Sequence, residues 1–296
     1  MQSSPVISIL TWTPCWPTSE RANWLRVTDV NPILVSQLAG AGLDRREARW
    51  LVEEFYDDPV ALEAAQKRRL SGEPLQYVLG HWPFRSLDLD LDERVLIPRP
   101  ESEELVDVAL TELAKNDAVT PLLLDVGCGS GAIGLSLLAE LGNRGLRASL
   151  VALDVSPDAL ALSRENARKH QLHAVTFVAS DWFSELDPSF RGRFDLIVAN
   201  PPYVSEVAFT ELDPVLSYEP RDALVAPDAS GVGGFADVQR IIRDAPRWLG
   251  PSGVLVLEHG YDQGEAALRA CRDAGYRDVR DLEDLAGHPR VLVARP

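Results

Sequence analysis

The feature that most constrains the fold is a series of apolar, strand-like runs that alternates with helical stretches from Pro121 onward. The runs are PLLLDV, ASLVALDV, AVTFVA, FDLIVAN and GVLVLEHG, and the helical stretches include residues 157–170 and 262–274. Continuous apolar strands separated by helices indicate a parallel sheet that helices cover on both faces. Ligands of such sheets bind beyond the carboxyl ends of the strands. Each of the first four runs ends in polar residues, so we expect the chemistry of the protein there.

The first run leads into a glycine-rich loop, DVGCGSGAIG, at residues 125–134. Its glycines permit positive φ angles and let a ligand approach the backbone, and the helix that follows offers N–H groups without helical partners. The loop predicts a nucleotide-like ligand, with a purely structural turn as the alternative. It does not separate NAD from S-adenosylmethionine, because Gly129, Gly131 and Gly134 also match G-x-G-x-x-G and Asp154 lies where a dinucleotide site has its ribose-binding acid.

Acidic residues follow the next two runs. Asp154 ends the second run, where its carboxylate could accept hydrogen bonds from both hydroxyls of a ribose; the alternative is a solvated aspartate at a strand end. Asp181 and Trp182 follow the third run, and this pair suits an adenine, with Asp181 near the exocyclic amine and Trp182 against the ring face. Trp182 could equally be a core or lid residue.

The fourth run ends in Asn200-Pro201-Pro202-Tyr203. Two prolines cannot continue a sheet ladder, so the chain leaves the sheet as a rigid corner. The carbonyl oxygens of Asn200 and Pro201 and the Asn200 side chain can then hold a planar NH₂ group, with Tyr203 against its flat face. Such a nitrogen is a poor nucleophile, but acceptors on its N–H bonds raise its electron density and positioning supplies much of the rest. This favours methyl transfer from S-adenosylmethionine over hydride transfer; the alternative is a strand followed by a proline-rich turn.

The bulk composition limits the partners and the compartment. A length of 296 residues suits about two domains, and a net charge of −16 opposes sequence-independent binding to a phosphate backbone. Cys15, Cys128 and Cys271 are far apart, so we expect a reducing compartment and no structural metal. Residues 6–16 are apolar but lack the basic start of a secretory signal, and no apolar run is long enough for a membrane span. We therefore expect a cytoplasmic protein that binds neither membranes nor nucleic acid directly.

The amino-terminal part of the chain differs in pattern from the rest. Residues 31–70 contain three stretches with apolar residues three or four apart, each with Asp or Asn at a plausible cap, and predict a small helical domain. Ser71-Gly72-Glu73-Pro74 ends this pattern. Residues 75–97 then alternate in a way that suits a β-hairpin or two short strands.

With these residues, the chain resembles the PrmC/HemK family, the protein-(glutamine-N5) methyltransferases that modify peptide chain release factors. The resemblance covers about residues 35–296 and adds to the glycine loop and Asn-Pro-Pro-Tyr the segments GEPLQYVLG, VLIPRPESEELV, YEPRDAL, GVLVLEHGYDQGE and DLAGHPRVLVARP. It implies an α/β class I (Rossmann-like) methyltransferase with a small helical N-terminal domain joined by a β-hairpin. The expected domains are an N-terminal segment and helical substrate-recognition domain at 1–72, a β-hairpin linker at 73–97 and a catalytic domain at 98–296.

The resemblance also implies site residues and partners. S-adenosylmethionine is the implied cofactor, and with the strand-end acids the expected cofactor-binding residues are Asp125, Gly127, Cys128, Gly129, Ser130, Gly131, Asp154, Asp181, Trp182 and Asn200. The implied catalytic residues, which hold the glutamine amide of a release factor's Gly-Gly-Gln motif and yield N5-methylglutamine, are Asn200, Pro201, Pro202 and Tyr203. The helical domain is implied to help grip the release factor.

Some features depart from the family and two other functions stay open. Ser102 stands where the family usually has Thr, residues 226–234 are longer and richer in glycine than expected, and the first thirty or so residues have no counterpart that we identify. A nucleic-acid amine methyltransferase uses similar geometry after flipping a base, although the acidic charge opposes it. A non-catalytic protein that binds S-adenosylmethionine is the other alternative.

Overall fold

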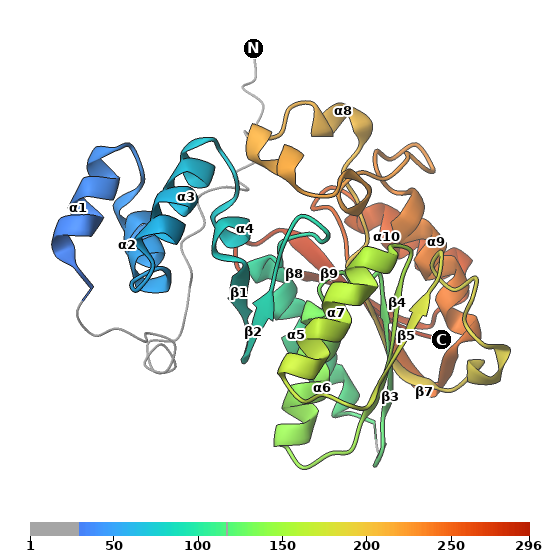
Figure 1. Ribbon diagram of the computed structural model, residues 1–296. Coiled ribbons are helices and arrows are strands. Elements are labelled where there is room, and N and C mark those ends of the chain that lie inside the picture. The colour runs from blue at the N-terminus through green and yellow to red at the C-terminus, as the bar shows by residue number, and fades with distance from the viewer. Residues whose placement is uncertain (1–29, 117) are drawn as a thin grey trace. The chain divides into compact units, whose positions relative to one another are not determined.

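The computed structural model describes residues 30–116 and 118–296 (Figure 1). The apolar stretch 6–16 and Cys15, on which part of the compartment prediction depends, lie outside the described residues. The chain divides into two compact units. Of the described residues, one unit comprises those up to Gly80 together with Leu212–Tyr218, and the other comprises those of His81–Glu211 and Glu219–Pro296.

The first unit is helical. Its described elements are α1 (Pro32–Gly40), α2 (Arg45–Glu54), α3 (Pro59–Leu70), α4 (Leu75–Leu79) and the 3₁₀ helix η3 (Pro214–Tyr218). Side chains cap the first three helices at the residues that the sequence pattern indicates: the carboxylate or amide oxygens of Asn31, Asp44 and Asp58 accept hydrogen bonds from backbone N–H groups of the first turn. Two hydrogen bonds of 2.9 and 3.0 Å between Arg69 and Glu47 link α3 to α2.

One short element of this unit differs from the expected strand. Residues Leu75–Leu79 form helix α4, which begins after Pro74 and ends at Gly80 with a φ of 80°. Leu75, Tyr77 and Val78 are all buried. A single helical turn can bury such neighbouring residues, whereas a strand turns alternate residues to opposite faces.

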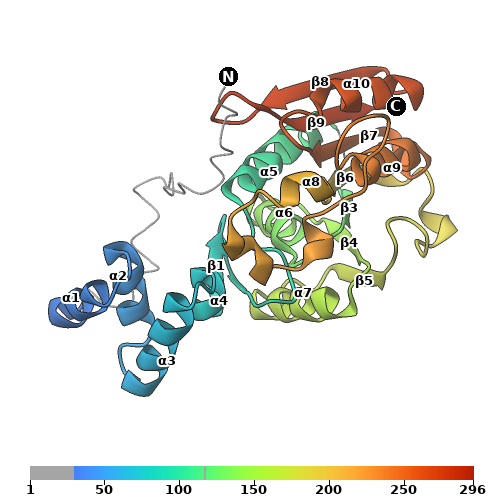
Figure 2. The same cartoon turned by 90° about the horizontal axis from the view of Figure 1, so that it is seen from above.

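The second unit begins with a hairpin and is built on a seven-stranded sheet. Strands β1 (His81–Phe84) and β2 (Leu87–Asp90) pair antiparallel, as the sequence indicates for part of residues 75–97. The order of strands in the large sheet is β5 (Val175–Ala179), β4 (Ser149–Asp154), β3 (Leu122–Val126), β6 (Phe194–Ala199), β7 (Leu249–Glu258), β9 (Pro289–Arg295) and β8 (Asp278–Glu283). Figure 2 shows the strands in this order, from β5 at the bottom of the view to β8 at the top.

The five strands that the sequence predicts are parallel to one another. The last two strands were not predicted: β9 is antiparallel to β7, and β8 is antiparallel to β9. A connection of five residues between β8 and β9 reverses the chain, and so short a connection allows only an antiparallel pair.

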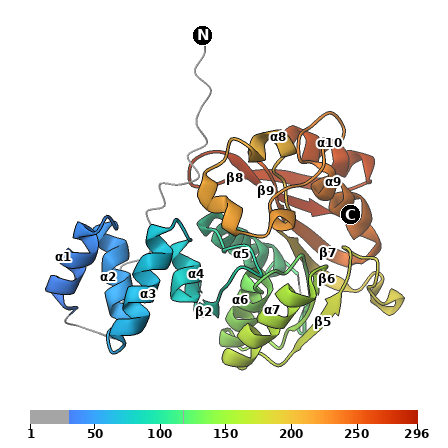
Figure 3. The same ribbon diagram turned by 45° about the horizontal axis from the view of Figure 1, so that its top comes forward.

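Helices cover both faces of the sheet (Figure 3). One face carries α5 (Pro100–Leu113), α6 (Ala132–Asn143) and α7 (Pro157–Lys169), and the other carries α9 (Ala236–Asp244) and α10 (Gly264–Asp273). Leu124 and Leu255 point into the core on the α9 and α10 side, and Leu123 and Val254 into the core on the α5 side. All four are fully buried, and burial of such a side chain stabilises the fold by about 1.5–3 kcal/mol.

The remaining short elements lie in the connections between strands and helices. They are η2 (Pro188–Phe190), α8 (Glu206–Phe209), η4 (Arg221–Ala223) and η5 (Ala245–Arg247). The Gly/Ala-rich stretch at residues 226–234, expected as a loop, contains an isolated bridge between Ala229 and Val232 and no helix.

Candidate active site

The sheet brings the predicted site residues to one edge. Strands β3, β4, β5 and β6 are parallel, so their carboxyl ends lie at the same edge of the sheet. Val126, the last residue of β3, pairs with Leu153 on one side and with Ala199 on the other. The glycine loop therefore starts between Asp154 and Asn200, on neighbouring strands about 4.8 Å apart.

The glycine loop has the backbone that only glycine adopts readily. Gly127, Gly129 and Gly131 have φ angles of 79°, 52° and 84°. A Cβ atom at Gly131 would lie 2.5 Å from the Ser163 hydroxyl oxygen, so a side chain there would also clash. Helix α6 begins directly after Gly131, which as a glycine offers no side-chain cap, and of the N–H groups in the first turn that of Gly134 is bound by the Asp125 carboxylate. The loop thus leaves backbone donors available to a ligand at the sheet edge.

Asp154 is tied to this loop. Its Oδ2 accepts a hydrogen bond of 2.8 Å from the Gly129 N–H, and its Oδ1 accepts one of 2.9 Å from the Ser156 N–H. Burial raises the pKa of the Asp154 carboxyl, and the backbone hydrogen bonds oppose that effect. A carboxylate has about four lone-pair positions, so the backbone hydrogen bonds do not exhaust its capacity to accept from ligand hydroxyls.

Asp125 lies beneath the loop with one oxygen unpaired. Its Oδ2 accepts a 2.9 Å hydrogen bond from the Gly134 N–H, whereas its Oδ1 is buried and has no hydrogen-bond partner in the described chain. Burial raises the pKa of Asp125 to about 7, and the nearby charge of Asp154 adds to the effect. Burial also raises the pKa of the Cys128 thiol well above its ordinary value, so this residue is not a reactive thiolate.

Trp182 packs against the glycine loop, whereas Asp181 pairs with the guanidinium of Arg240. Trp182 has a φ of 53°, and its ring would lie 3.3 Å from a Cβ atom placed on Gly127. Its indole N–H donates to Asp237 over 3.2 Å. The carboxylate of Asp181 is exposed and accepts two hydrogen bonds of 2.9 and 3.0 Å from Arg240. Contact of Asp181 with an adenine amine therefore stays a prediction. It requires the Asp181 carboxylate either to bind Arg240 and the amine together or to release Arg240.

The Asn-Pro-Pro-Tyr corner is held by side chains from other elements. The Asn200 Nδ2 group donates to the Ser102 hydroxyl over 2.9 Å, and the Tyr203 hydroxyl donates to Glu258 over 3.1 Å. The backbone carbonyl of Tyr203 accepts a 3.1 Å hydrogen bond from the Gln263 side chain. The same Gln263 amide donates to the Gly233 carbonyl over 2.8 Å, so it fixes the 226–234 loop next to the corner.

The environment of Tyr203 keeps its phenol protonated. Burial raises its pKa, and the negative charge of Glu258 raises it further. The guanidinium of Arg290 lies 5.9 Å from the centre of the Tyr203 ring. Tyr203 therefore presents a held aromatic ring and is unsuited to the role of a base.

Sequence reasoning missed several residues of this site, namely Ser102 as a contact of Asn200, and Asp237, Arg240, Glu258, Gln263 and Arg290. A usable signal existed for Glu258 alone, because it ends the fifth apolar run as polar residues end the first four.

The segment before α5 is also held by hydrogen bonds to a distant side chain. Glu219 accepts hydrogen bonds from the Ile97 N–H over 2.9 Å and from Arg99 over 2.5 Å.

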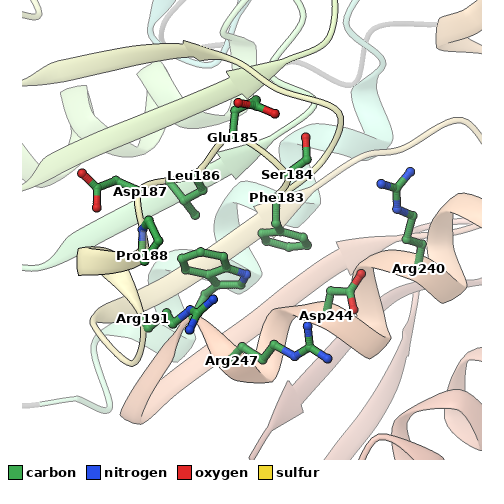
Figure 4. A pocket seen from close by; sticks show the side chains of 11 residues that line it. Phe183, Ser184, Glu185, Leu186, Asp187, Pro188, Arg191, Arg240, Asp244 and Arg247 are labelled. Atoms are coloured by element: carbon green, nitrogen blue, oxygen red, sulfur yellow. The ribbon is translucent and has the colours of Figure 1, made fainter.

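A hollow of about 440 Å³ lies beside the Arg240–Asp181 pair (Figure 4). Its wall includes Phe183 and Trp248, whose rings stack 6.2 Å apart, and Arg191, which lies over the Trp248 ring. Arg240 also lines it and joins its rim to Asp181. None of the predicted site residues contributes to its lining, so we do not assign the cofactor to it.

In the part of the chain that the structure describes, no three or more His, Cys, Asp or Glu side chains are arranged to hold a metal ion. Among residues 30–116 and 118–296, no helix is both long and apolar enough to cross a membrane.

Known proteins that resemble this chain are methyltransferases. A family model described as "Methyltransferase domain" matches residues 122–282. A release factor glutamine methyltransferase of Vibrio cholerae is 41% identical over 240 residues, which cover 79% of this chain and 78% of that protein. The enzyme of the same name from Escherichia coli is 35% identical over 298 residues, which cover 93% and 99% of the two chains.

Solved structures support the fold. A 16S rRNA methyltransferase of T. thermophilus, solved in complex with AdoMet and guanosine, matches with a TM-score of 0.50 at 18% identity and covers 73% of this chain and 49% of that one. At this identity the likeness concerns the fold alone. It agrees with the α/β class I methyltransferase architecture.

Proposed function

The chain belongs to the release factor glutamine methyltransferase family, and on that premise we propose that Asn200–Tyr203 hold the reacting glutamine while the glycine loop holds S-adenosylmethionine. The protein is an S-adenosylmethionine-dependent methyltransferase that acts on the side-chain amide of a release factor glutamine. The observation that carries the residue assignment is the pairing of Val126 with Ala199, because it starts the loop and the corner side by side.

The residues of the sheet edge fit the cofactor. The positive φ angles of the loop glycines allow close approach to the backbone, and the buried Oδ1 of Asp125 lacks a partner that a cationic ligand or an ordered water would supply. We assign Asp154 to the ribose hydroxyls and Trp182 to the adenine face. When bound, S-adenosylmethionine supplies a methyl carbon that is activated by a positively charged sulfur.

The chain's own residues orient the amide. Asn200 Oδ1 and the Pro201 carbonyl oxygen accept hydrogen bonds from the two N–H groups of the glutamine side-chain amide. The Tyr203 ring packs against the flat face of that amide. These acceptors increase the electron density on nitrogen and restrict its position. Orientation of this kind can lower the activation barrier by several kcal/mol, of the order of 7–11 in favourable cases. Since Tyr203 stays protonated, the proton that nitrogen loses after methylation leaves to water or to one of the acceptors.

We further propose that the target is the Gly-Gly-Gln glutamine of release factors and that residues 1–72 contribute to recognition of the protein substrate. The catalytic part then comprises residues 98–296, with 73–97 as the linker. The net charge of −16 supports a protein substrate over a nucleic acid, because phosphate backbones require clustered Lys and Arg. The work of release factors in translation supports a cytoplasmic location.

The test is mass spectrometry of a purified release factor after incubation with the enzyme and S-adenosylmethionine. The expected product carries one added methyl group on the loop glutamine. Asn200→Ala abolishes or nearly abolishes the product, whereas Asn143→Ala, which changes an exposed asparagine at the end of α6, keeps it. Wild-type turnover in Asn200→Ala would contradict the role of the corner, and preferential methylation of DNA or RNA would contradict the substrate.

A further inference from the structure

Three side chains that are distant in sequence meet beside the Asn-Pro-Pro-Tyr corner. Ser102 comes from the first turn of α5, Glu258 is the last residue of β7, and Asn200 follows β6. The Ser102 hydroxyl donates to Glu258 Oε2 over 2.8 Å and accepts from Asn200 Nδ2 over 2.9 Å. Ser102 is 3% exposed and Glu258 is 1% exposed, so bulk water does not compete for these hydrogen bonds.

The hydrogen bonds that join Glu258, Ser102 and Asn200 have only one consistent set of donors and acceptors while Glu258 is ionised. A carboxylate can only accept, and a serine hydroxyl has a single hydrogen to give. Because Ser102 gives that hydrogen to Glu258, its oxygen can only accept on its other side. The group of Asn200 that faces Ser102 must therefore be the NH₂ group, and Oδ1 is directed elsewhere.

The orientation of this amide decides what the corner can bind. An Asn200 that presents Oδ1 offers an acceptor to the N–H bonds of a substrate carboxamide. With the amide rotated by half a turn, the Asn200 NH₂ group would face the NH₂ group of the substrate, and neither could accept a hydrogen bond from the other. A buried donor without an acceptor costs about 1–3 kcal/mol. Neither the backbone nor the two prolines distinguishes the two orientations, since they differ only by rotation of the amide.

Glu258 also holds the other end of the corner. Its Oε1 accepts from the Tyr203 hydroxyl over 3.1 Å, so one of its oxygens contacts the last residue of the Asn-Pro-Pro-Tyr segment, while the other reaches the first residue only through Ser102. Burial raises the pKa of Glu258 and the charge of Glu101 adds to this effect, whereas the hydrogen bond from Ser102 and the charge of Arg290 favour the ionised form. Arg290 is itself fixed by a 3.1 Å hydrogen bond to the His259 carbonyl.

From this arrangement we infer that Ser102 and Glu258 are positioning residues that lock the Asn200 carboxamide with its oxygen toward the substrate amide. The inference rests on the proposed function of Asn200 and deepens it. Ser102 acts through Asn200, so its effect disappears when Asn200 is absent. Glu258 acts through Ser102 at one end of the corner and directly on Tyr203 at the other.

The first test separates the hydroxyl from the volume of the side chain. Ser102→Thr and Ser102→Val have nearly the same shape, but only Thr keeps a hydroxyl. We expect Ser102→Thr to retain most of the methylation rate, and Ser102→Val and Ser102→Ala to lose roughly 10- to 100-fold in kcat, as a misplaced acceptor would. The KM for the release factor should change little, because the rest of the protein contact is intact. Equal rates for Ser102→Thr and Ser102→Val would overturn the inference.

The decisive test is a double-mutant cycle with Ser102→Ala and Asn200→Ala, measured in single-turnover assays with radiolabelled methyl donor at enzyme concentrations high enough to resolve the residual rate without Asn200. If Ser102 acts through Asn200, the double variant is no slower than Asn200→Ala alone. Losses that multiply would show that Ser102 acts independently, and the inference would be wrong. Ser136→Ala is the control, since Ser136 is fully buried in α6 and its hydroxyl has no hydrogen-bond partner among the described residues. Absence of methylation by the wild type would reject the proposed function instead.

Discussion

Replacement of Asp125 by asparagine is the most quantitative test of the electrostatics at the sheet edge. The side chain of Asp125 is 1% exposed, one of its oxygens is bound by the Gly134 N–H, and the other has no hydrogen-bond partner in the described chain. Burial therefore raises its pKa from 3.8 to about 7. The asparagine side chain of the Asp125→Asn variant has the same shape but cannot ionise, so the variant isolates the contribution of this one titration.

The sign of the effect follows from the direction of the shift. Between the two pKa values the folded protein binds more protons than the unfolded chain, so stability falls as pH rises. The contribution of Asp125 is fully present below pH 3.8 and is lost as pH approaches about 7. The difference of about 3 between these pKa values corresponds, at 1.36 kcal/mol for each pKa unit, to a total loss of about 4 kcal/mol.

The assay is denaturant unfolding of wild type and Asp125→Asn at several pH values. Between about pH 5.5 and about pH 8, the wild type should lose about 2 kcal/mol relative to the variant, which is the part of the titration that falls in this range. Asp187→Asn serves as control: Asp187 is exposed, and its hydrogen bonds to Ser189 lower its pKa, so its titration lies below this range. Parallel pH profiles for wild type and Asp125→Asn would refute the reasoning that burial controls this carboxyl.

Two further changes test the glycine loop and the ion pairs that join Glu112 of α5 to strands β8 and β9. Gly131→Ala places a Cβ atom 2.5 Å from the Ser163 oxygen at a φ of 84°, so it should cost about 1–3 kcal/mol in unfolding free energy and weaken S-adenosylmethionine binding in calorimetry. Gly129→Ala, where a Cβ meets nothing within 4 Å, should cost less stability, and an equal cost at both sites would contradict the steric argument. Glu112→Gln weakens the pairing of a buried carboxylate with Arg295 and two other cations, so thermal unfolding should occur at lower temperature, with a loss of up to about 3–5 kcal/mol. An unchanged melting temperature would show that these ion pairs do not stabilise the fold.

Local patterns in the chain were sufficient to locate the parts of the site that the backbone makes. The glycines of the loop adopt the positive φ angles that their sequence indicates, and two prolines end β6 where the sequence places them. The five parallel strands follow from apolar runs long enough to be buried on both faces. The short helix α4 and the antiparallel strands β8 and β9 escaped prediction, because their geometry depends on packing and pairing more than on local pattern.

The sequence by itself determined which chemical groups stand at the strand ends, because glycine, proline and apolar periodicity act over a few neighbouring residues. Only the tertiary structure decided how those groups are oriented. Ser102 and Glu258 are 156 positions apart, yet one hydrogen bond between them directs the amide of Asn200. Asp181 faces Arg240, 59 positions away, for the same kind of reason. A hydrogen bond depends on distance and direction in space, and for residues so far apart the chain imposes neither until the sheet and its helices have packed.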